Sequence, residues 1–420
     1  MTPEPPAISE RSWAHAADAR QGVTCPRRRA EQDVSVSAAW QGLRILGCVL
    51  HRFLAIGQGH GAPGRGAATL ALLAASVAGC ASHQPPTGQS PGPVPRGDRV
   101  LSVALLESET GGFDAAVRLA RSAGMQETIF SVNWDEVEPR PGDFQEGALP
   151  LVRAYFPAVD LPIHLTVATI DTNNLRLPPD LAGRAFDDPE VAARFRRLLG
   201  FVLDQLAGVR ITGLSIGNEV DAWLGQDARR WAEYHAFFAA TAPFGRQRGL
   251  RVGVKATLDG LTQRSVSDLM ALNRLTDLVL VTYYPLLPDW GVKDPSVVRG
   301  DFDALVALYP GRRIAFLEAG YPSSALLGSS GERQQEFVRR VFEAWDAHAV
   351  QVETVCFFAL TDPSPSLVDT LQDYYGLPDP RFRDYLATLG LRTWPGLGAD
   401  KPALGELRAQ ARARGWPTGP

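Results

Sequence analysis

The sequence predicts an α/β protein whose one large domain is a (β/α)₈ TIM barrel, and two observations favour this fold. From Val100 onward, short β-branched or apolar runs alternate with amphipathic segments, which is the pattern of parallel strands joined by crossover helices. Eight such runs fit into about 300 residues, close to the usual size of this barrel. We expect strands at Leu101–Leu106, Glu127–Asn133, Ile163–Ile170, Gly213–Gly217, Arg251–Ala256, Leu278–Tyr283, Arg313–Leu317 and Thr354–Leu360.

The segments between these runs predict an outer ring of helices. Within Pro189–Leu206, Ala228–Ala242 and Glu332–Ala347, apolar residues recur at three- and four-residue spacing, so each helix presents one apolar face. The competing arrangement is a doubly wound open sheet, which usually has a glycine-rich turn after its first strand. Leu105–Glu109 contains no glycine, so the barrel is favoured.

Composition excludes several classes of partner and cofactor. The 420 residues carry a formal net charge of -4, whereas nucleic-acid-binding proteins usually have a basic patch, so we expect no nucleic-acid partner. The cysteines form no CxxC pair and the histidines form no HExxH motif, so we expect neither a metal nor another cofactor. The four cysteines are Cys25, Cys48, Cys80 and Cys356.

A signal peptide and a lipid anchor are predicted before the barrel. Residues 67–79 form a short apolar run after Arg65, too brief to span a bilayer and typical of the core of a signal peptide. The run ends in Val77-Ala78-Gly79-Cys80, which resembles the lipobox of bacterial lipoproteins, where the cysteine is acylated and becomes the mature N-terminus. We therefore expect an exported protein of the cell envelope, anchored to a membrane through Cys80.

The domain limits follow from these patterns. Residues 1–66 are an N-terminal extension longer than a signal peptide needs, which a translation start near Val49 or Leu50 would explain. Residues 67–80 are the apolar run and lipobox, and residues 81–98, rich in Pro, Gly and Ser, are a flexible tether. Residues 99–395 are the barrel, and residues 396–420 are a tail with a helical pattern.

Two glutamates stand where predicted strands end. Glu219 follows the fourth run and Glu318 follows the seventh. In such a barrel the carboxyl ends of all eight strands meet at one mouth, where reactive groups lie. Glycoside hydrolysis needs two carboxyl groups there, one to protonate the leaving oxygen and one to attack the anomeric carbon. The sequence therefore predicts Glu219 and Glu318 as a catalytic pair.

The segments around both glutamates resemble clan A glycoside hydrolases, which are retaining β-glycosidases with a TIM barrel. The matching residues are Gly217-Asn218-Glu219-Val220 on strand four and Leu317-Glu318-Ala319-Gly320-Tyr321-Pro322-Ser323 on strand seven. The second segment is similar to that of the endo-β-1,3-glucanases, and the endo-β-1,4-galactanases have a related one. The resemblance implies that Glu219 is the acid/base, that Glu318 is the nucleophile and that Asn218 contacts the sugar 2-hydroxyl.

Further substrate-binding residues are predicted at the same mouth. The clan often has a tyrosine after strand six that donates a hydrogen bond to the nucleophile, and Tyr283 and Tyr284 are the candidates, with Tyr283 preferred. Trp134 follows strand two and Trp223 lies shortly after strand four, so both are expected to stack on sugar rings.

The chain also departs from the clan pattern at two strands. Many members carry an arginine at strand two and a tryptophan at strand eight. Here strand two ends in Asn133-Trp134 and strand eight in Phe357-Phe358-Ala359-Leu360. These differences leave the exact family open, as well as the sugar, the linkage and endo or exo action.

Two other functions are compatible with a barrel at the cell surface. A non-catalytic glycan-binding lipoprotein would keep the aromatic residues without needing two carboxylates. A Schiff-base lyase would use Lys255, at the end of strand five, where an imine could form. The other interpretation of Lys255 is an ion pair with Glu219 or Asp259. Under the main hypothesis the partner is an oligo- or polysaccharide.

Overall fold

The computed structural model describes residues 92–106, 112–394 and 398–419, and this part of the chain contains the predicted barrel strands. Each predicted run overlaps an observed strand, and the fifth run is divided in two around Val254. The barrel strands are β1 (Val100–Val103), β2 (Thr128–Asn133), β3 (Ile163–Asp171), β5 (Ile211–Asn218), β6 (Val252–Gly253) with β7 (Lys255–Thr257), β8 (Val279–Tyr283), β9 (Ile314–Ala319) and β10 (Val352–Phe357). The short β4 (Asn174–Leu175) pairs antiparallel with the end of β3.

The strands form a closed ring. Two sheets run in the orders β1-β10-β9-β8-β7 and β2-β3-β5-β6. On one side they are joined by a parallel bridge between Ser102 and Glu127, where the Val103 N–H donates to the Glu127 carbonyl at 3.2 Å. On the other side only Val254 separates β6 from β7. The ladders between barrel strands are parallel, so all carboxyl ends open at the same mouth.

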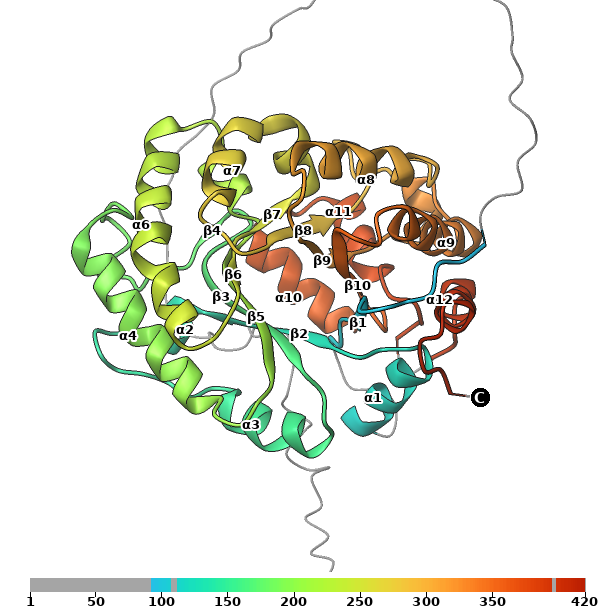
Figure 1. The fold of residues 1–420 in the computed structure, drawn as a ribbon, viewed down its shortest axis with the longest axis horizontal. Coiled ribbons are helices and arrows are strands. Elements are labelled where there is room, and N and C mark those ends of the chain that lie inside the picture. Colours follow the sequence, from blue (N-terminus) through green and yellow to red (C-terminus); the bar gives the residue numbers. More distant parts are fainter. Residues whose placement is uncertain (1–91, 107–111, 395–397, 420) are drawn as a thin grey trace, which may run out of the picture.

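Helices surround the strands (Figure 1). The three predicted helices are present as α4 (Pro189–Gln205), α6 (Ala228–Gln247) and α9 (Gly331–Ala347). Each begins after a residue whose side chain accepts a backbone N–H of the first turn, and these caps are Asp188, Asp227 and Ser330. The remaining outer helices are α1 (Phe113–Ser122), α3 (Leu149–Ala158), α7 (Val266–Asn273) and α8 (Val297–Leu308).

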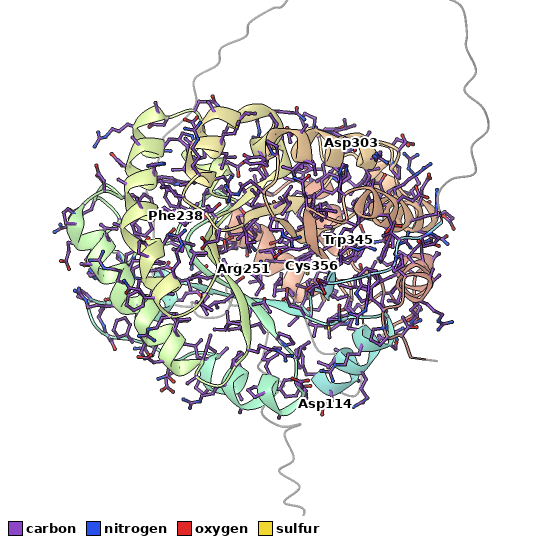
Figure 2. All side chains as sticks on the ribbon, viewed as in Figure 1. Asp114, Phe238, Arg251, Asp303, Trp345 and Cys356 are labelled. Atoms are coloured by element: carbon purple, nitrogen blue, oxygen red, sulfur yellow. The ribbon has the colours of Figure 1, made fainter. Side chains whose placement is uncertain are left out.

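The core has two layers, one inside the barrel and one between barrel and helices. Leu278, Leu280, Ala315 and Leu317 pack together as a small interior cluster. Between barrel and helices, Phe316 of β9 stacks on Phe302 of α8 with ring centroids 4.2 Å apart. Figure 2 shows Cys356 near the middle of the molecule and Asp114 and Asp303 at its rim. Leu280 and Leu317 precede Thr282 and Glu318 on β8 and β9, so the interior layer lies beneath the mouth.

Two helices after β10 lie over the mouth, and Figure 1 shows α10 near the centre of the ring. The last residues of α10 (Pro365–Tyr375) are held by the β3–β4 hairpin, because Asn173 donates to the Tyr375 carbonyl at 2.9 Å. At the other side, Arg381 of α11 (Pro380–Ala387) donates to the Asp289 carbonyl, after β8, at 2.6 Å. We call residues 365–387 the mouth cover.

The C-terminal segment forms α12 (Pro402–Ala413), which packs beside α9. Trp416 lies against Trp345 of α9, with ring centroids 5.1 Å apart, and Arg414 forms an ion pair with Asp346 at 2.7 Å. The predicted extension, signal peptide and lipobox cysteine Cys80 lie outside the described residues, as does most of the tether. Within the part of the chain that the structure describes, none of the helices combines the length and apolar character of a membrane span.

Candidate active site

Glu219 lies where the chain turns sharply from β5 into α5 (Val220–Leu224). Gly217 has a φ of 88°, and a Cβ there would lie 2.5 Å from the Val220 side chain and 2.6 Å from the Tyr234 hydroxyl, so only glycine fits. Glu219 itself has a φ of 46°, in the left-handed region that non-glycine residues seldom occupy. Such strained residues cluster at functional sites. The backbone conformation of the Gly-Asn-Glu motif therefore orients the Glu219 carboxylate.

Both carboxylate oxygens of Glu219 accept hydroxyl hydrogen bonds. Thr172 donates to Oε2 at 2.7 Å and Thr282, from β8, donates to Oε1 at 2.6 Å. Burial is the main cause that raises the pKa of Glu219 to about 7, and the charge of Glu318 raises it further, while the two threonine hydroxyls act in the opposite direction. A large share of Glu219 is therefore protonated at neutral pH.

Glu318 reaches the same mouth because β9 contains a bulge. Val281 of β8 pairs with Phe316, but the next residue, Thr282, pairs with Glu318, so Leu317 is an extra residue in β9. A bulge of this kind changes which way the following side chain points. Without it, Glu318 would share the outward face of Phe316. Thr282 is thus the strand partner of Glu318 and a donor to Glu219.

Glu318 is held by a cation and a phenol. Lys255 Nζ lies 3.0 Å from Oε1, and the Tyr284 hydroxyl donates to Oε2 at 2.8 Å. The Lys255 side chain is 2% exposed and that of Glu318 is 13% exposed, so this ion pair is shielded from water. Burial and the Glu318 charge raise the pKa of Tyr284 well above its ordinary value, which keeps its proton on the hydroxyl. The two glutamates therefore have contrasting partners.

Asn218 is fixed by a carboxylate that also contacts the mouth cover. Its Nδ2 donates to Asp171 Oδ1 at 2.7 Å, and the Tyr374 hydroxyl of α10 donates to Asp171 Oδ2 at 2.6 Å. The Asn218 Oδ1 atom is buried and has no hydrogen-bond partner among the described residues. This oxygen is therefore an unsatisfied acceptor on the residue next to Glu219.

The preference for Tyr283 over Tyr284 is wrong. Tyr283 is 1% exposed, and its hydroxyl donates to Asp301 of α8 at 2.6 Å, on the outer side of the barrel. Tyr284 is the residue that contacts Glu318. Side chains alternate along a strand, so Leu278, Leu280, Thr282 and Tyr284 share the inner face. The alternation of side chains along β8 therefore indicates Tyr284 as the residue that faces Glu318.

The two tyrosines provide a matched pair of variants. We expect Tyr284→Phe to lower kcat/KM on a cleaved glycoside by roughly 10–100-fold, because a hydrogen bond to a charged group is lost. Tyr283→Phe should leave kcat/KM within about threefold and lower the melting temperature by several degrees, because it removes a buried bond to Asp301. Steady-state kinetics and thermal unfolding of both variants test this. The reverse pattern would contradict the geometry.

The prediction that Trp134 stacks on sugar rings is also wrong, because Trp134 is a core residue. Its side chain is fully buried, its Nε1 donates to Glu138 at 2.8 Å, and its ring meets Phe195 of α4 edge-on. A ring without exposed surface cannot stack on a sugar. Trp223 is half-buried, with the Arg230 guanidinium 4.3 Å from its ring centroid and Phe186 edge-on to it. Its role as a sugar platform stays a prediction.

Sequence reasoning missed the residues that the mouth cover brings to the carboxylates. Tyr385 of α11 meets Tyr284 edge-on with centroids 5.7 Å apart and stacks on Trp290 at 5.8 Å. Burial is the main cause that raises the pKa of Tyr385 well above its ordinary value, and the negative charges of Glu219 and Glu318 raise it further. No strand motif marks this tyrosine in the sequence, since it comes from a helix that crosses the mouth.

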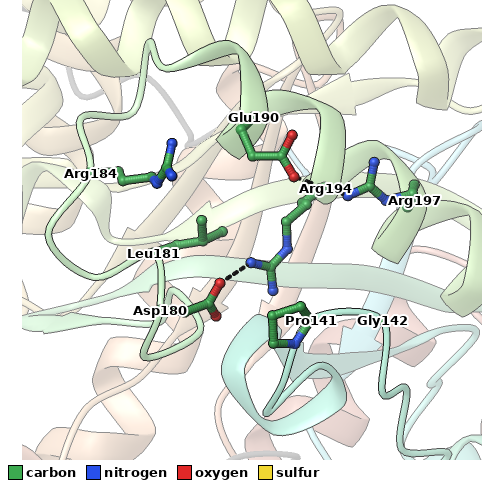
Figure 3. A pocket seen from close by; sticks show the side chains of 8 residues that line it. All are labelled: Pro141, Gly142, Asp180, Leu181, Arg184, Glu190, Arg194 and Arg197. Carbon is green, nitrogen blue, oxygen red and sulfur yellow. Dashed lines mark hydrogen bonds and ion pairs between the residues drawn. The ribbon is translucent and has the colours of Figure 1, made fainter.

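A separate hollow of about 530 Å³ lies away from these groups (Figure 3). Its walls include three arginines, and each is already paired: Arg184 with Asp188, Arg194 with Asp180 and Glu138, and Arg197 with Glu190. None of its lining residues is Glu219, Glu318 or a contact of either. The hollow is therefore a different feature from the carboxylate site.

The fold resembles solved glycoside hydrolases. An exo-β-1,4-mannosidase from Opitutaceae bacterium strain TAV5 matches with a TM-score of 0.58 and 16% identity over 75% of this chain, and the match spans only 59% of that protein. A GH5_18 protein from Bifidobacterium longum subsp. longum, in complex with Manβ1-4GlcNAc, matches with a TM-score of 0.57 and 18% identity. This match covers 77% of this chain and 80% of that protein. A family 39 glycoside hydrolase from Bacteroides cellulosilyticus matches with a TM-score of 0.51 and 13% identity. This match covers 76% of this chain and 64% of that protein.

These likenesses establish the fold. The chain has a (β/α)₈ barrel like that of these glycoside hydrolases, as the alternation of strand and helix patterns predicted. No known protein-family profile matches the sequence, and no curated protein is detectably similar to it. The fold alone does not specify an activity, which depends on the residues of the site.

Proposed function

We propose that this protein is a glycoside hydrolase that cleaves β-linked glycans with retention of anomeric configuration. The observation that carries the proposal is the contrast between two carboxyl groups at one barrel mouth. Glu219 accepts two hydroxyl hydrogen bonds and has a pKa raised to about 7, whereas Glu318 is paired with the Lys255 ammonium. A double displacement needs one carboxyl group that can donate a proton near neutrality and one that is stabilised as an anion.

The first half-reaction uses both groups at once. A Glu318 oxygen attacks the anomeric carbon, the bond to the leaving oxygen breaks, and the Glu219 proton moves to that oxygen. In the second half-reaction Glu219, now a carboxylate, takes a proton from water, which attacks the same carbon and releases Glu318. Asn218 contacts the sugar 2-hydroxyl, as its resemblance to the clan motif implies, and Tyr284 orients Glu318 through its hydrogen bond.

The substrate class is a β-linked oligo- or polysaccharide, and β-mannosides are the first to try. The Bifidobacterium longum protein holds Manβ1-4GlcNAc, and the Opitutaceae protein is named an exo-β-1,4-mannosidase. Trp290 is partly exposed and stacks on Tyr385, whose ring meets that of Tyr284, the donor to Glu318, so the Trp290 indole suits the apolar face of a sugar.

A glycoside panel tests the proposal. Purified protein is incubated with 4-nitrophenyl β-mannoside, β-glucoside, β-galactoside and β-xyloside and with β-1,3- and β-1,4-linked oligosaccharides. We expect hydrolysis of at least one, with proton NMR showing the β-anomer of the product first. Early release of the α-anomer would contradict retention. Binding without any turnover would instead support the non-catalytic glycan-binding alternative.

The Schiff-base alternative has its own test at Lys255. An amine must be unprotonated to form an imine, and the ion pair with Glu318 at 3.0 Å favours the ammonium form. Borohydride treatment in the presence of aldehyde or ketone substrates should therefore leave the mass of the protein unchanged. A reduced adduct at Lys255 would favour the lyase.

We also propose that the enzyme is exported and lipid-anchored through Cys80. The support is the apolar run 67–79 followed by Val77-Ala78-Gly79-Cys80 and a Pro/Gly/Ser-rich segment. Expression in a bacterium with lipoprotein processing should yield a membrane-associated protein whose mature mass begins at an acylated Cys80. Cys80→Ala should abolish the mass increment and release the protein from membranes.

A further inference from the structure

Lys255 has an unusual place for a lysine, inside the barrel. It begins β7 and is 1% exposed, and its backbone N–H donates to the Ser215 hydroxyl of β5 at 3.0 Å. Burying an ammonium is costly unless an anion compensates its charge. Glu318 is that anion, 3.0 Å from Nζ. The pair is therefore a fixed element of the site and not a surface contact.

Three other titratable groups near Lys255 or Glu318 are neutral at neutral pH. His164, on β3, has its pKa lowered to about 3 by burial and by the Lys255 charge. Burial raises the pKa of Cys356, on β10, and that of Tyr284. The buried acid Glu127 lies at the opposite end of the barrel, and its charged neighbours are Glu353 and Arg251. Among these groups, Glu318 is thus the anion that is paired with Lys255.

The proposed reaction moves one negative charge between these two carboxyl groups. At the start Glu318 is a carboxylate and Glu219 carries a proton. After the first half-reaction Glu318 is an ester and Glu219 is a carboxylate. Lys255 keeps its positive charge in both states, so the three groups sum to zero before and after the step. A constant net charge avoids an uncompensated charge in a buried site.

We propose that Lys255 is a positioning residue whose ammonium supplies the fixed positive charge against which Glu318 and Glu219 exchange one negative charge. It orients Glu318 from strand five, through the 3.0 Å contact between Nζ and Oε1. This inference rests on the proposed function. It assigns Lys255 a role that differs from that of an imine-forming nucleophile.

The test compares Lys255→Met and Lys255→Arg with Lys401→Met. Lys401 is a matched control, because it is also a part-buried lysine in an ion pair, with Asp362 at 2.7 Å, but contacts neither glutamate. Two quantities are measured: the carboxyl titration of protein labelled with ¹³C at the glutamate side-chain carboxyl, and the pH profile of kcat/KM on the best glycoside. Glu219→Gln and Glu318→Gln assign the two resonances.

We expect Lys255→Met to move the first titration step of the carboxyl pair upward by about 1–3 pH units. The acidic limb of kcat/KM should move with it, and the maximum should fall by roughly 10²-fold or more. Lys255→Arg should restore the titration, with partial activity. Lys401→Met should lower thermal stability without moving either profile.

Other outcomes would contradict either the role of Lys255 or the proposed function. A folded Lys255→Met protein whose carboxyl titration matches the wild type would overturn the inference, and so would a borohydride-trapped adduct at Lys255. If the wild type hydrolyses no glycoside, the proposed function fails, but the NMR titration still decides whether Lys255 sets the charge state of the pair. The two failures are therefore distinguishable.

Discussion

Replacing Glu318 with alanine should reduce kcat/KM on the best aryl β-glycoside by roughly 10⁵-fold, the scale on which loss of a covalent nucleophile acts. The physical reason is specific to this site, because the carboxylate that attacks the anomeric carbon is removed while Lys255 and Tyr284 remain. Stopped-flow and long-incubation assays on the same substrate cover this range of rates. Loss of less than about tenfold would exclude Glu318 as nucleophile.

The variant also allows a chemical rescue. Alanine leaves a cavity beside the Lys255 ammonium, where a small anion such as azide fits and can attack the anomeric carbon directly. The product should be the glycosyl azide of opposite configuration to the substrate, since one displacement replaces two. Glu127→Gln is a suitable control, because Glu127 is another buried glutamate with a pKa raised to about 7, at the other end of the barrel. It should keep nearly full activity.

Much of the barrel could be predicted from sequence because buried parallel strands are continuous apolar runs with amphipathic segments between them. β3, for example, is buried at all nine positions, so its run stands out as Ile163–Ile170. The caps Asp188 and Asp227 mark two of the helix starts in the same local way. The catalytic pair was predicted as the residues that directly follow such runs.

The remaining features depend on information that neighbouring residues do not carry. The bulge that turns Glu318 inward shows only in the register between β8 and β9. Alternation along β8 puts Thr282 and Tyr284 on the inner face and Tyr283 on the outer face, so the prediction of Tyr283 as the partner of Glu318 is wrong. Trp134 was assigned to the surface of the mouth, although a tryptophan after a strand can equally well fill the core. Each error concerns the direction of a side chain and not the identity of an element.

The mouth cover could not be predicted because its contacts join residues far apart in the chain. Tyr374 reaches Asp171, 203 positions away, and through it Asn218. Tyr385, from the helix after α10, contacts the ring of Tyr284, which is the donor to Glu318. A helical pattern indicates that such segments fold, but the surface on which they pack is set by tertiary structure. The mouth cover therefore adds Tyr374 and Tyr385 to the site, and strand motifs alone do not indicate either residue.

Glu219→Gln should affect the two half-reactions differently, which identifies an acid/base. With 4-nitrophenol, a good leaving group, the first half-reaction needs little protonation, whereas water attack in the second lacks its base, so the glycosyl-enzyme should accumulate. We expect kcat to fall by roughly 10²–10⁴-fold. Mass spectrometry of the mixture should show the covalent adduct on Glu318. Azide should accelerate turnover and give the glycosyl azide of retained configuration, opposite to that from Glu318→Ala.

The pH dependence of activity and of stability provides a second, independent test of Glu219. In the wild type Glu219 must be protonated to act as the acid, so kcat/KM on substrates with poor leaving groups should fall as pH rises through about 7. Because the folded protein holds this proton more tightly than the unfolded chain, the free energy of unfolding should also fall as pH rises from 4.5 towards about 7. Glu219→Gln cannot ionise, so it should lose the basic limb and be at least as stable as the wild type at pH 8. If the limb near pH 7 persists in Glu219→Gln, another group is the proton donor.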